Sequence, residues 1–312
     1  MRVIEALEAI SPEEFAGGSC VAIGKFDGLH RGHQAILRSV VESARAEGRR
    51  AVALTFANNP LSYLRPELCP QPLMSREQRL EAFEAAGIEV CVMLRFDGDI
   101  ASIPAERFVA EVLVERLRAR HIVMGADFRF GHRGAGDGAL LRIQGERYGF
   151  SADVLELVED GEAGQVSSSR VREAVLGGDV ESAARMLGRP PAVRGEVVHG
   201  DARGREIGFP TANLGGELEG LVPADGVYAG WVVVRGERLV AAISVGANVT
   251  FDPAGESRVE AFVLDFDRDI YGERVEVQFA RRLRSMERFE SLEALIAQMR
   301  ADVGRTRELL AP

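Results

Sequence analysis

Apolar runs alternate with amphipathic stretches through the first part of the chain. Each run is short and largely β-branched or aliphatic, as expected of a strand buried in a parallel sheet. The predicted strands are residues 21–23, 51–56, 90–94, 122–125 and 152–157. Strands that alternate with helical segments are typical of a parallel sheet with helices on its faces. We therefore predict a doubly wound α/β domain over residues 1–187.

Two of the intervening helices have specific signals. Ser75 followed by Gln78 forms a capping box, which satisfies backbone N–H groups at a helix start. After Pro104, apolar residues recur at helical spacing. They are Phe108, Val109, Val112 and Leu113. These signals predict one helix after Ser75 and another after Pro104.

The pattern changes at residues 188–191 (GRPP), where a glycine that can stop a helix is followed by two prolines. We predict the linker between two domains there. Beyond it, β-branched runs are separated by Gly, Asp and Pro turns. They are residues 193–198, 230–234, 240–244, 259–266 and 275–279. This pattern predicts an antiparallel β domain over residues 188–312, and a β-barrel is the form we expect.

The last apolar positions of the chain recur at helical spacing behind Ser291, a candidate N-cap. They are Leu292, Leu295, Ile296, Met299 and Val303. The pattern predicts a C-terminal helix that packs on the sheet of the second domain.

Composition narrows the class of protein. The 312 residues, 46% of them hydrophobic, suffice for two cores. A net charge of -10 argues against binding nucleic acid through a basic face, so a polyanionic ligand must be met by local donors. Residues 1–10 lack a basic-then-apolar pattern, and no apolar run approaches the roughly 20 residues of a membrane span. Three cysteines without metal-like spacing predict reduced thiols. We expect a cytoplasmic protein with no membrane partner.

Residues 24–33 (GKFDGLHRGH) directly follow the first predicted strand and precede a helix. In an open α/β sheet, ligands bind at the carboxyl ends of strands, where a helix N-terminus offers N–H groups to an anion. His30 and His33 project from one face of the first helical turn, and neutral imidazoles there can donate to phosphate oxygens. Glycines let a nucleotide approach the backbone closely. The phosphate-binding residues predicted in this loop are Gly24, Phe26, Asp27, Gly28 and Gly32.

The H-x-G-H pattern of these residues resembles that of nucleotidylyltransferases, which transfer a nucleotidyl group and release pyrophosphate. The resemblance implies that His30 and His33 are catalytic, stabilising the pentacovalent α-phosphate and the departing phosphates by pre-placed donors. The pattern alone leaves the acceptor open, because pantetheine phosphate, nicotinate mononucleotide and glycerol phosphate transferases share it. A single histidine at a helix start would more simply be a surface or capping residue.

Two further segments resemble prokaryotic FAD synthetases. Residues 123–131 (VMGADFRFG) are similar to that family's V-G-x-D/N-F-x-F-G segment, which implies that Asp127 contacts the adenylyl-transfer site. Residues 166–172 (VSSSRVR) are similar to its I-S-S-T-x-I-R motif. This implies that Ser167, Ser168 and Arg172 face the ATP phosphates while a serine caps the helix. Alone, such a serine cluster would be only a cap.

The chain departs from this family at two positions. The family commonly has T-F-x-P-H-P after its second strand, whereas residues 55–60 are TFANNP, so Asn59 replaces a third histidine. Asn59 can donate a hydrogen bond but cannot titrate, and we assign it to the flavin-binding residues. Ser169 replaces a threonine and retains the hydroxyl group.

Residues 200–214 (GDARGREIGFPTANL) resemble the riboflavin kinase signature G-x-G-R-x-L-G-F-P-T-A-N-L. Backbone amides of a glycine-rich loop suit ATP phosphates, and hydroxyl and carboxamide oxygens are hard ligands that suit Mg²⁺. The resemblance implies that Thr211 and Asn213 hold the metal. The ATP-binding residues that it implies are Gly204, Arg205, Gly208, Phe209 and Pro210. A glycine turn before an edge strand would explain single residues here, but not their order.

Residues 259–266 (VEAFVLDF) continue the resemblance. It implies that Glu260 is the general base for the riboflavin 5′-hydroxyl as that oxygen attacks the γ-phosphate of ATP. Without the preceding signature, Glu260 would be an ordinary solvent-facing carboxylate. Val249 replaces a proline of the family's G-x-N-P-T-F segment. The flavin-binding residues implied in this half are Tyr228, Asn248, Arg284, Met286 and Glu287.

Together these segments are similar to the bifunctional riboflavin kinase/FAD synthetase family over nearly the whole chain. The resemblance implies phosphorylation of riboflavin to FMN by residues 188–312 and adenylylation of FMN to FAD by residues 1–187. ATP is the implied co-substrate, and Mg²⁺ the implied cofactor. One alternative is a kinase whose nucleotidylyltransferase module is impaired or takes another phosphorylated substrate, for which Asn59 is the only support. A second alternative is a flavin-binding protein without turnover.

Overall fold

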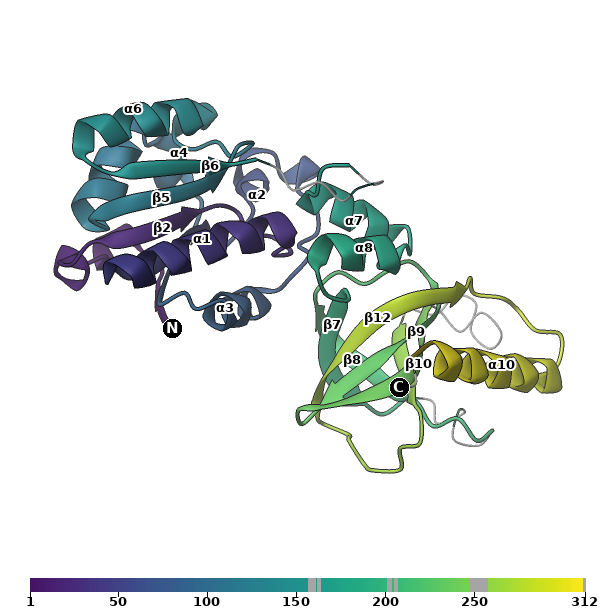
Figure 1. Ribbon diagram of the computed structural model, residues 1–312. Helices are drawn as coiled ribbons and strands as arrows, with labels where there is room; N and C mark the ends of the chain where they lie inside the picture. The colour runs from purple at the N-terminus through teal and green to yellow at the C-terminus, as the bar shows by residue number, and fades with distance from the viewer. Residues whose placement is uncertain (157–160, 162–163, 201–203, 205–206, 247–257, 311–312) are drawn as a thin grey trace. The chain divides into compact units, whose positions relative to one another are not determined.

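The structure is a computed structural model that describes residues 1–312 apart from 157–160, 162–163, 201–203, 205–206, 247–257 and 311–312. The described chain forms two compact units, residues 1–167 and residues 168–312. Purple to teal ribbons in Figure 1 belong to the first unit, and green to yellow ribbons belong to the second. Both predicted fold classes, a parallel α/β sheet and an antiparallel barrel, are confirmed.

A six-stranded parallel sheet forms the centre of the first unit, in the order β1-β4-β3-β2-β5-β6 (Figure 1). The strands are β1 Arg2–Ile4, β2 Ser19–Ile23, β3 Arg50–Phe56, β4 Val90–Leu94, β5 Ala119–Gly125 and β6 Ser151–Leu155. The chain winds outward from β2 through β3 to β4 and then crosses to β5 on the other side of β2. The carboxyl end of β2 is therefore the switch point at which such sheets bind ligands.

Both faces of this sheet are apolar and covered by other elements. Successive strand residues point to opposite sides, so alternate residues of one strand belong to different apolar clusters. Val21 and Ile23 of β2 belong to one apolar cluster, which includes Phe108, whereas Cys20 and Ala22 belong to another. Helix α1 (Arg31–Glu47) packs in the second cluster. The remaining helical segments are η1 Leu7–Ala9, η2 Pro12–Phe15, α2 Pro60–Leu64, η3 Pro66–Leu68, α3 Arg76–Ala85, α4 Gly98–Ser102, α5 Ala105–Arg107, η4 Phe108–Arg116, η5 His132–Gly134 and α6 Gly138–Tyr148.

The two predicted helix signals in this unit are confirmed. The Gln78 N–H donates to Ser75 Oγ at 3.1 Å, and the Ser75 N–H donates to Gln78 Oε1 at 2.8 Å, which completes the capping box. The predicted apolar face after Pro104 is buried, although η4 is a π-helix and its turns are wider than expected. Strand β1 has no counterpart among the predicted strands, because three residues give too short a pattern.

The second unit is a closed antiparallel barrel in the strand order β10-β11-β8-β7-β12-β9. The strands are β7 Ala192–Val198, β8 Ala212–Glu219, β9 Gly226–Val234, β10 Glu237–Gly246, β11 Arg258–Val263 and β12 Arg274–Arg284. Strand β8 is not among the predicted strands, since adjacent glycines at 215 and 216 interrupt its apolar pattern. The strand predicted over 259–266 ends at Val263, before Asp265 adopts a left-handed φ of 55°.

The C-terminal helix α10 (Leu292–Leu310) contacts β9 and β10, as predicted, and Ser291 Oγ accepts the Ala294 N–H at 3.2 Å. Its packing differs from the expectation. Asp302 and Thr306 are its buried residues, whereas the predicted apolar face is only partly covered or, at Leu292, exposed. Asp302 and Thr306 of α10 are therefore the residues buried against the barrel, whereas Leu295, Met299 and Val303 line a cavity between α10 and the barrel strands.

Helices α7 (Ser168–Leu176) and α8 (Val180–Leu187) belong to the second compact unit. Val180 joins the apolar core of the barrel, and α8 contacts β12. The compact units consequently part before the predicted linker at residues 188–191. A functional boundary between residues 187 and 188 stays a prediction.

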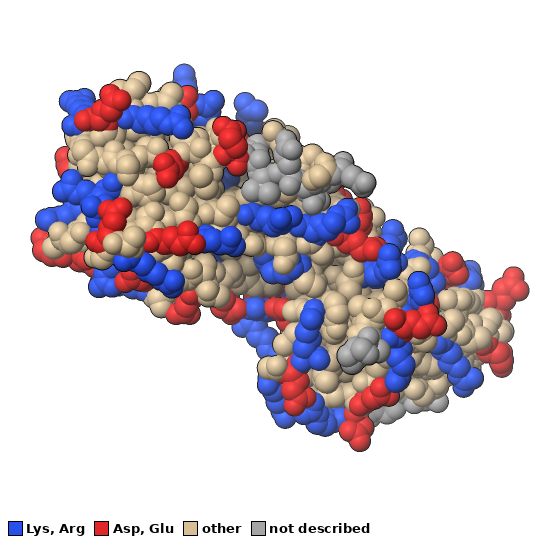
Figure 2. All heavy atoms as spheres, viewed as in Figure 1, with Lys and Arg blue, Asp and Glu red and all other residues tan. Residues whose placement is uncertain are grey.

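Charged side chains of both signs are interspersed on the face of the molecule in Figure 2. Among the described residues, no helix is both long enough and apolar enough to cross a bilayer.

We expect Leu113→Ala to destabilise the first unit. Its side chain is fully buried in the apolar cluster on one face of the sheet, and its truncation leaves a cavity. Such a change costs about 2–5 kcal/mol of unfolding free energy. Thermal and urea unfolding measure the loss. Ile143→Ala, at an exposed position of α6, is the matched control and should change stability by less than about 0.5 kcal/mol. Equal effects of the two substitutions would contradict this view of the core.

Candidate functional site

The loop after β2 reaches the switch point of the sheet in an unusual backbone conformation. Phe26, Gly28 and Leu29 have φ values of 52°, 79° and 44°, all in the left-handed region. Non-glycine residues in that region cost on the order of 1–3 kcal/mol each. The surrounding structure must therefore hold the loop in place.

His30 and His33 lie together at the end of this loop. His30 is the N-cap of α1, and its Nδ1 accepts the backbone N–H of His33 at 3.4 Å. The two rings stack with centroids 3.7 Å apart and planes 19° apart. His30 is 5% exposed, and His33 is half-buried. Because Nδ1 of His30 is an acceptor, a neutral His30 has its proton on Nε2, where it can donate to a ligand.

His33 is held neutral by its surroundings. Its pKa lies well below the usual 6.5, first because burial disfavours the charged form and second because His30 is close. Its Nδ1 is buried and has no hydrogen-bond partner among the described residues. The pair thus offers ring nitrogens to an anion without contributing two full charges.

The predicted loop residues support this arrangement in different ways. Asp27 Oδ1 accepts the Leu73 N–H at 2.9 Å, and a Cβ on Gly28 would lie 2.6 Å from Leu73 Cδ1. A Cβ on Gly24 would lie 2.9 Å from the Phe26 ring. That ring is fully buried, so Phe26 can reach ATP only through its backbone. Gly32 lies in the first turn of α1.

Two neighbouring loops end at the same edge of the sheet. Asp127 follows β5, is exposed, and has its Oδ1 3.1 Å from the position of a Cβ on Gly125. Asn59 follows β3 and caps α2, since its Oδ1 accepts the Leu61 N–H at 3.0 Å. The loop of residues 24–30, which we call the histidine loop, follows β2. Because β3 and β5 flank β2, the structure brings both residues to the edge of the sheet at which this loop lies.

The serine motif lies at the boundary of the compact units. Ser167 ends the first unit, and α7 begins at Ser168 in the second. Arg172 Nη1 donates to the Ser168 carbonyl at 3.4 Å. The contact of these residues with ATP stays a prediction.

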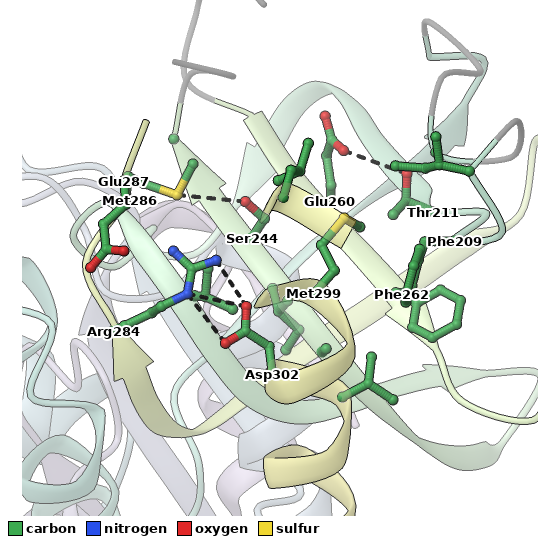
Figure 3. Close-up of a pocket in the computed structure, with 18 of the residues that line it drawn as sticks. Phe209, Thr211, Ser244, Glu260, Phe262, Arg284, Met286, Glu287, Met299 and Asp302 are labelled. Atoms are coloured by element: carbon green, nitrogen blue, oxygen red, sulfur yellow. Dashed lines mark hydrogen bonds and ion pairs between the residues drawn. The ribbon is translucent and has the colours of Figure 1, made fainter. Parts of the chain in front are cut away.

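A second site lies in the barrel, where Thr211, Asn213 and Glu260 meet. Figure 3 shows the contact between Thr211 and Glu260. Glu260 of β11 is directly opposite Asn213 of β8 in the sheet register. Thr211 Oγ1 donates to Glu260 Oε2 at 3.4 Å, and Asn213 Nδ2 donates to the Thr211 carbonyl at 3.2 Å. The register therefore brings the metal-binding and general-base candidates into one cluster.

Two cavities share Thr211. The first, which we call the α10 cavity, is also lined by Glu260, Phe209 and α10. The second, the β7 cavity, is lined by Val197 of β7, Pro210 and residues 266–271. A hydroxyl group that lines both cavities lies where two bound substrates could meet.

Three predicted flavin-binding residues line the α10 cavity, namely Arg284, Met286 and Glu287 (Figure 3). Arg284 forms an ion pair with Asp302 of α10 at 2.8 Å, and Ser244 Oγ lies 3.8 Å from Met286 Sδ. Several other lining residues were not among the predicted site residues. They are Ser244, Phe262, Leu295, Met299 and Asp302. The helical spacing of Leu295 and Met299 was a usable signal, but Asp302 had none.

Gly204 also lines the α10 cavity, whereas the remaining predicted residues of this unit do not line it or lie outside the described residues. Tyr228 is fully buried, donates to the Ala224 carbonyl and packs on Phe279, and it is not among the cavity-lining residues. Its flavin contact stays a prediction. Gly208 has a φ of 87° and precedes Phe209, whose N–H donates to the Gly204 carbonyl at 2.7 Å. Arg205 and Asn248 lie outside the described residues.

The chemistry of the Thr211 and Asn213 side chains suits Mg²⁺. Thr211 offers a hydroxyl oxygen. The Asn213 amide nitrogen donates to the Thr211 carbonyl and hydroxyl oxygens, which leaves its carbonyl oxygen as a potential metal ligand. A Cβ on Gly200 would lie 2.6 Å from Asn213 Cγ, so the glycine there leaves space for the carboxamide. Mg²⁺ commonly takes few protein ligands and completes its shell with water and substrate phosphates.

Two family models match successive parts of the chain. A family model for FAD synthetase matches residues 13–170, and one for riboflavin kinase matches residues 187–310. A bifunctional riboflavin kinase/FMN adenylyltransferase from Pseudomonas fluorescens is 37% identical, with 100% of this chain and 99% of the relative covered. The protein of the same name from Escherichia coli K12 is 34% identical, with 99% and 97% covered.

A solved structure shares the fold over the full length. The crystal structure described as a macrolide-efflux protein from Streptococcus pneumoniae superimposes with a TM-score of 0.86. The two chains are 36% identical, and 98% of each is covered. Both the parallel sheet and the barrel thus occur in one experimentally determined chain.

We expect the His33 imidazole of the folded protein to stay neutral below pH 6.5, where an ordinary histidine takes up a proton. The folded protein resists protonation of His33, whereas the unfolded chain binds a proton near pH 6.5, so stability falls as the pH drops below that value. NMR of the ring carbon protons, assigned with His33→Gln, measures the titration. A midpoint at or above 6.5 in the folded protein would contradict the burial argument.

Proposed function

This chain belongs to the family of bifunctional riboflavin kinase/FMN adenylyltransferases, and we propose that it converts riboflavin to FMN and FMN to FAD with two molecules of ATP. The observation that supports this most strongly is that each compact unit brings its predicted catalytic residues together: the stacked His30 and His33 at the switch point, and Thr211, Asn213 and Glu260 in the barrel. A protein that only binds flavin has no use for either cluster.

In the kinase reaction, we place riboflavin in the α10 cavity and the ATP phosphates at the β7 cavity. The apolar residues of α10 then contact the flavin, beside Arg284, Met286 and Glu287. The riboflavin 5′-oxygen attacks the γ-phosphorus, the bond from that phosphorus to the bridging oxygen breaks, and ADP leaves. Glu260 accepts the hydroxyl proton. Phosphoryl transfer depends mainly on positioning and charge neutralisation, so the base contributes only part of the rate.

Thr211 and Asn213 are the residues that would hold Mg²⁺. The ion would supply positive charge against the ATP phosphates. The protein contributes the hydroxyl and carboxamide oxygens and holds Glu260 beside them. Backbone amides of the loop that contains Gly204, Gly208 and Pro210 complete the proposed phosphate site, together with Arg205.

In the adenylyl reaction, a phosphate oxygen of FMN attacks the α-phosphorus of ATP, and pyrophosphate leaves. His30 and His33 donate hydrogen bonds to the oxygens on which charge develops, and no covalent enzyme intermediate forms. Neutral imidazoles suit this role because they can donate N–H groups at the pH where the folded protein keeps His33 uncharged. We assign Asp127, Ser167, Ser168 and Arg172 to ATP, and Asn59 to the flavin substrate.

An impaired adenylyl module is the second candidate. Asn59 replaces a histidine of the family pattern and uses its side-chain oxygen to cap α2. The histidine pair is intact beside it, so we favour an active module. The protein's three free cysteines support a reducing compartment, and we propose the cytoplasm.

Substitutions should separate the two reactions. We expect His30→Ala to lower FAD formation from FMN by about 10²–10³-fold and leave FMN formation unchanged, because one pre-placed donor is lost. We expect Glu260→Gln to lower FMN formation by about 10²–10⁴-fold and leave adenylylation of supplied FMN unchanged. Chromatographic separation of riboflavin, FMN and FAD measures both rates. Loss of both activities in either folded variant would show that the sites are not independent.

The kinase reaction should also respond selectively to changes at the proposed metal ligands. We expect Asn213→Leu to raise the Mg²⁺ concentration for half-maximal FMN formation at least about 10-fold, a typical effect of disturbing a metal site. Titration of the initial rate with Mg²⁺ measures this. The Mg²⁺ dependence of FAD formation by the same variant is the control. An unchanged kinase titration would exclude Asn213 as a ligand.

A further inference from the structure

Arg79 of α3 contacts the backbone of two active-site loops from inside the protein. Its guanidinium group is buried, with the residue only 8% exposed. Nη1 donates to the Phe56 carbonyl at 2.9 Å and to the Lys25 carbonyl at 3.3 Å. Nη2 donates to the Ala57 carbonyl at 2.9 Å. Lys25 lies near the start of the histidine loop, Phe56 ends β3, and Ala57 begins the loop that leads to Asn59.

This arginine has no carboxylate within ion-pair distance among the residues that the structure describes. Burial lowers its pKa, and the nearby Asp27 opposes that effect, but a guanidinium group stays charged in proteins. A buried charge without an ion-pair partner is costly, and here backbone carbonyls solvate it. A leucine or methionine would fill the same space without that cost. The contribution of Arg79 therefore lies in its N–H groups, which donate to the three backbone carbonyls.

The same helix anchors the loop at a second point. Phe83, one turn beyond Arg79, packs edge-on against Phe26 with ring centroids 5.5 Å apart. Phe26 in turn packs against His33, at 5.2 Å between centroids. Thr55 Oγ1 adds a further bond to the Lys25 carbonyl, at 3.1 Å. Helix α3 is thus connected to the histidine pair by a polar contact at the start of the loop and by an aromatic contact in its middle.

We propose that Arg79 is a positioning residue for adenylyl transfer, which fixes the histidine loop and the β3 loop relative to each other. It touches neither substrate. Its three hydrogen bonds hold Lys25 beside the end of β3. They thereby keep the histidine loop, with its left-handed residues Phe26 and Leu29, in the conformation that places His30 and His33 at the start of α1. The inference rests on the proposed adenylyl reaction and adds a residue that none of the sequence motifs contains.

The experiment compares Arg79→Met with a matched control on the same helix, Arg76→Met. Arg76 is partly exposed and pairs with Glu5 and Glu77, and it makes no hydrogen bond or ion pair to the histidine loop among the described residues. We expect Arg79→Met to lower kcat for FMN adenylylation by about 100-fold, because small misplacements of catalytic groups have effects of that size. KM for ATP and for FMN should change by less than about threefold, since the histidines act on charge that develops in the transition state.

The second unit supplies an internal control, because FMN formation by the same purified chain should remain at the wild-type rate. Arg79→Lys keeps the charge and three donors, so it should recover at least about a third of the wild-type kcat. A purely structural role would lower the unfolding temperature and leave kcat per folded molecule unchanged, and that result would overturn the proposal.

Two further outcomes are decisive. An equal loss of kinase and adenylyl activity in Arg79→Met would overturn the selective role. If Arg79→Met does not accumulate as folded protein, Arg79→Gln replaces it, and a kcat within about threefold of wild type would contradict the proposal. Failure of the proposed function looks different, since the wild-type protein itself would then form no FAD from FMN and ATP.

Discussion

A protein with a net charge of -10 must bind the phosphates of ATP twice, and this constraint explains how both sites are built. Long-range attraction to a basic face is not available, so each site depends on donors held a few ångströms from the ligand. In the first unit we propose that these are a helix start, glycine-rich backbone and the imidazoles of His30 and His33, of which burial keeps His33 neutral. In the second unit we propose the backbone amides of a glycine-rich loop, together with a Mg²⁺ ion that the oxygens of Thr211 and Asn213 would hold.

Neutral donors work only where their positions are fixed, and each fold fixes them differently. The parallel sheet brings the loops after β2, β3 and β5 to one edge, and contacts from α3 hold the loop whose backbone is most strained. The barrel uses strand register, which places Glu260 opposite Asn213 and next to Ser244. Closing the barrel with α10 adds an apolar wall, held by the Arg284–Asp302 ion pair.

Much of this architecture could be predicted because it follows from local patterns. Buried strands, the Ser75 capping box, the Ser291 cap and the order of the motifs depend on residues close together in the sequence. Strands β1 and β8 were missed because one is only three residues long and the other contains adjacent glycines. The unit boundary was also not evident, because the packing of Val180 into the barrel core is a tertiary contact.

The sites themselves could be predicted only in part. Motif order indicated His30, His33, Thr211, Asn213 and Glu260, and the structure brings each set together. No sequence pattern indicates that Thr211 lines two cavities or that Asp302 is buried against Arg284. Arg79 likewise resembles any charged residue of a surface helix, and only the three-dimensional fold shows that it faces inward. The contacts that define such residues are made with residues distant in the sequence, so no local pattern reveals them.

The central claim is that one chain contains two catalytic centres that work independently on a shared intermediate. Mixing His30→Ala and Glu260→Gln proteins and following FAD formation from riboflavin and ATP tests it most directly. Each variant alone should form almost no FAD from riboflavin, whereas the mixture should form it, because FMN released by one variant is adenylylated by the other. A mixture that accumulates FMN but no FAD, or that forms neither, would contradict the account.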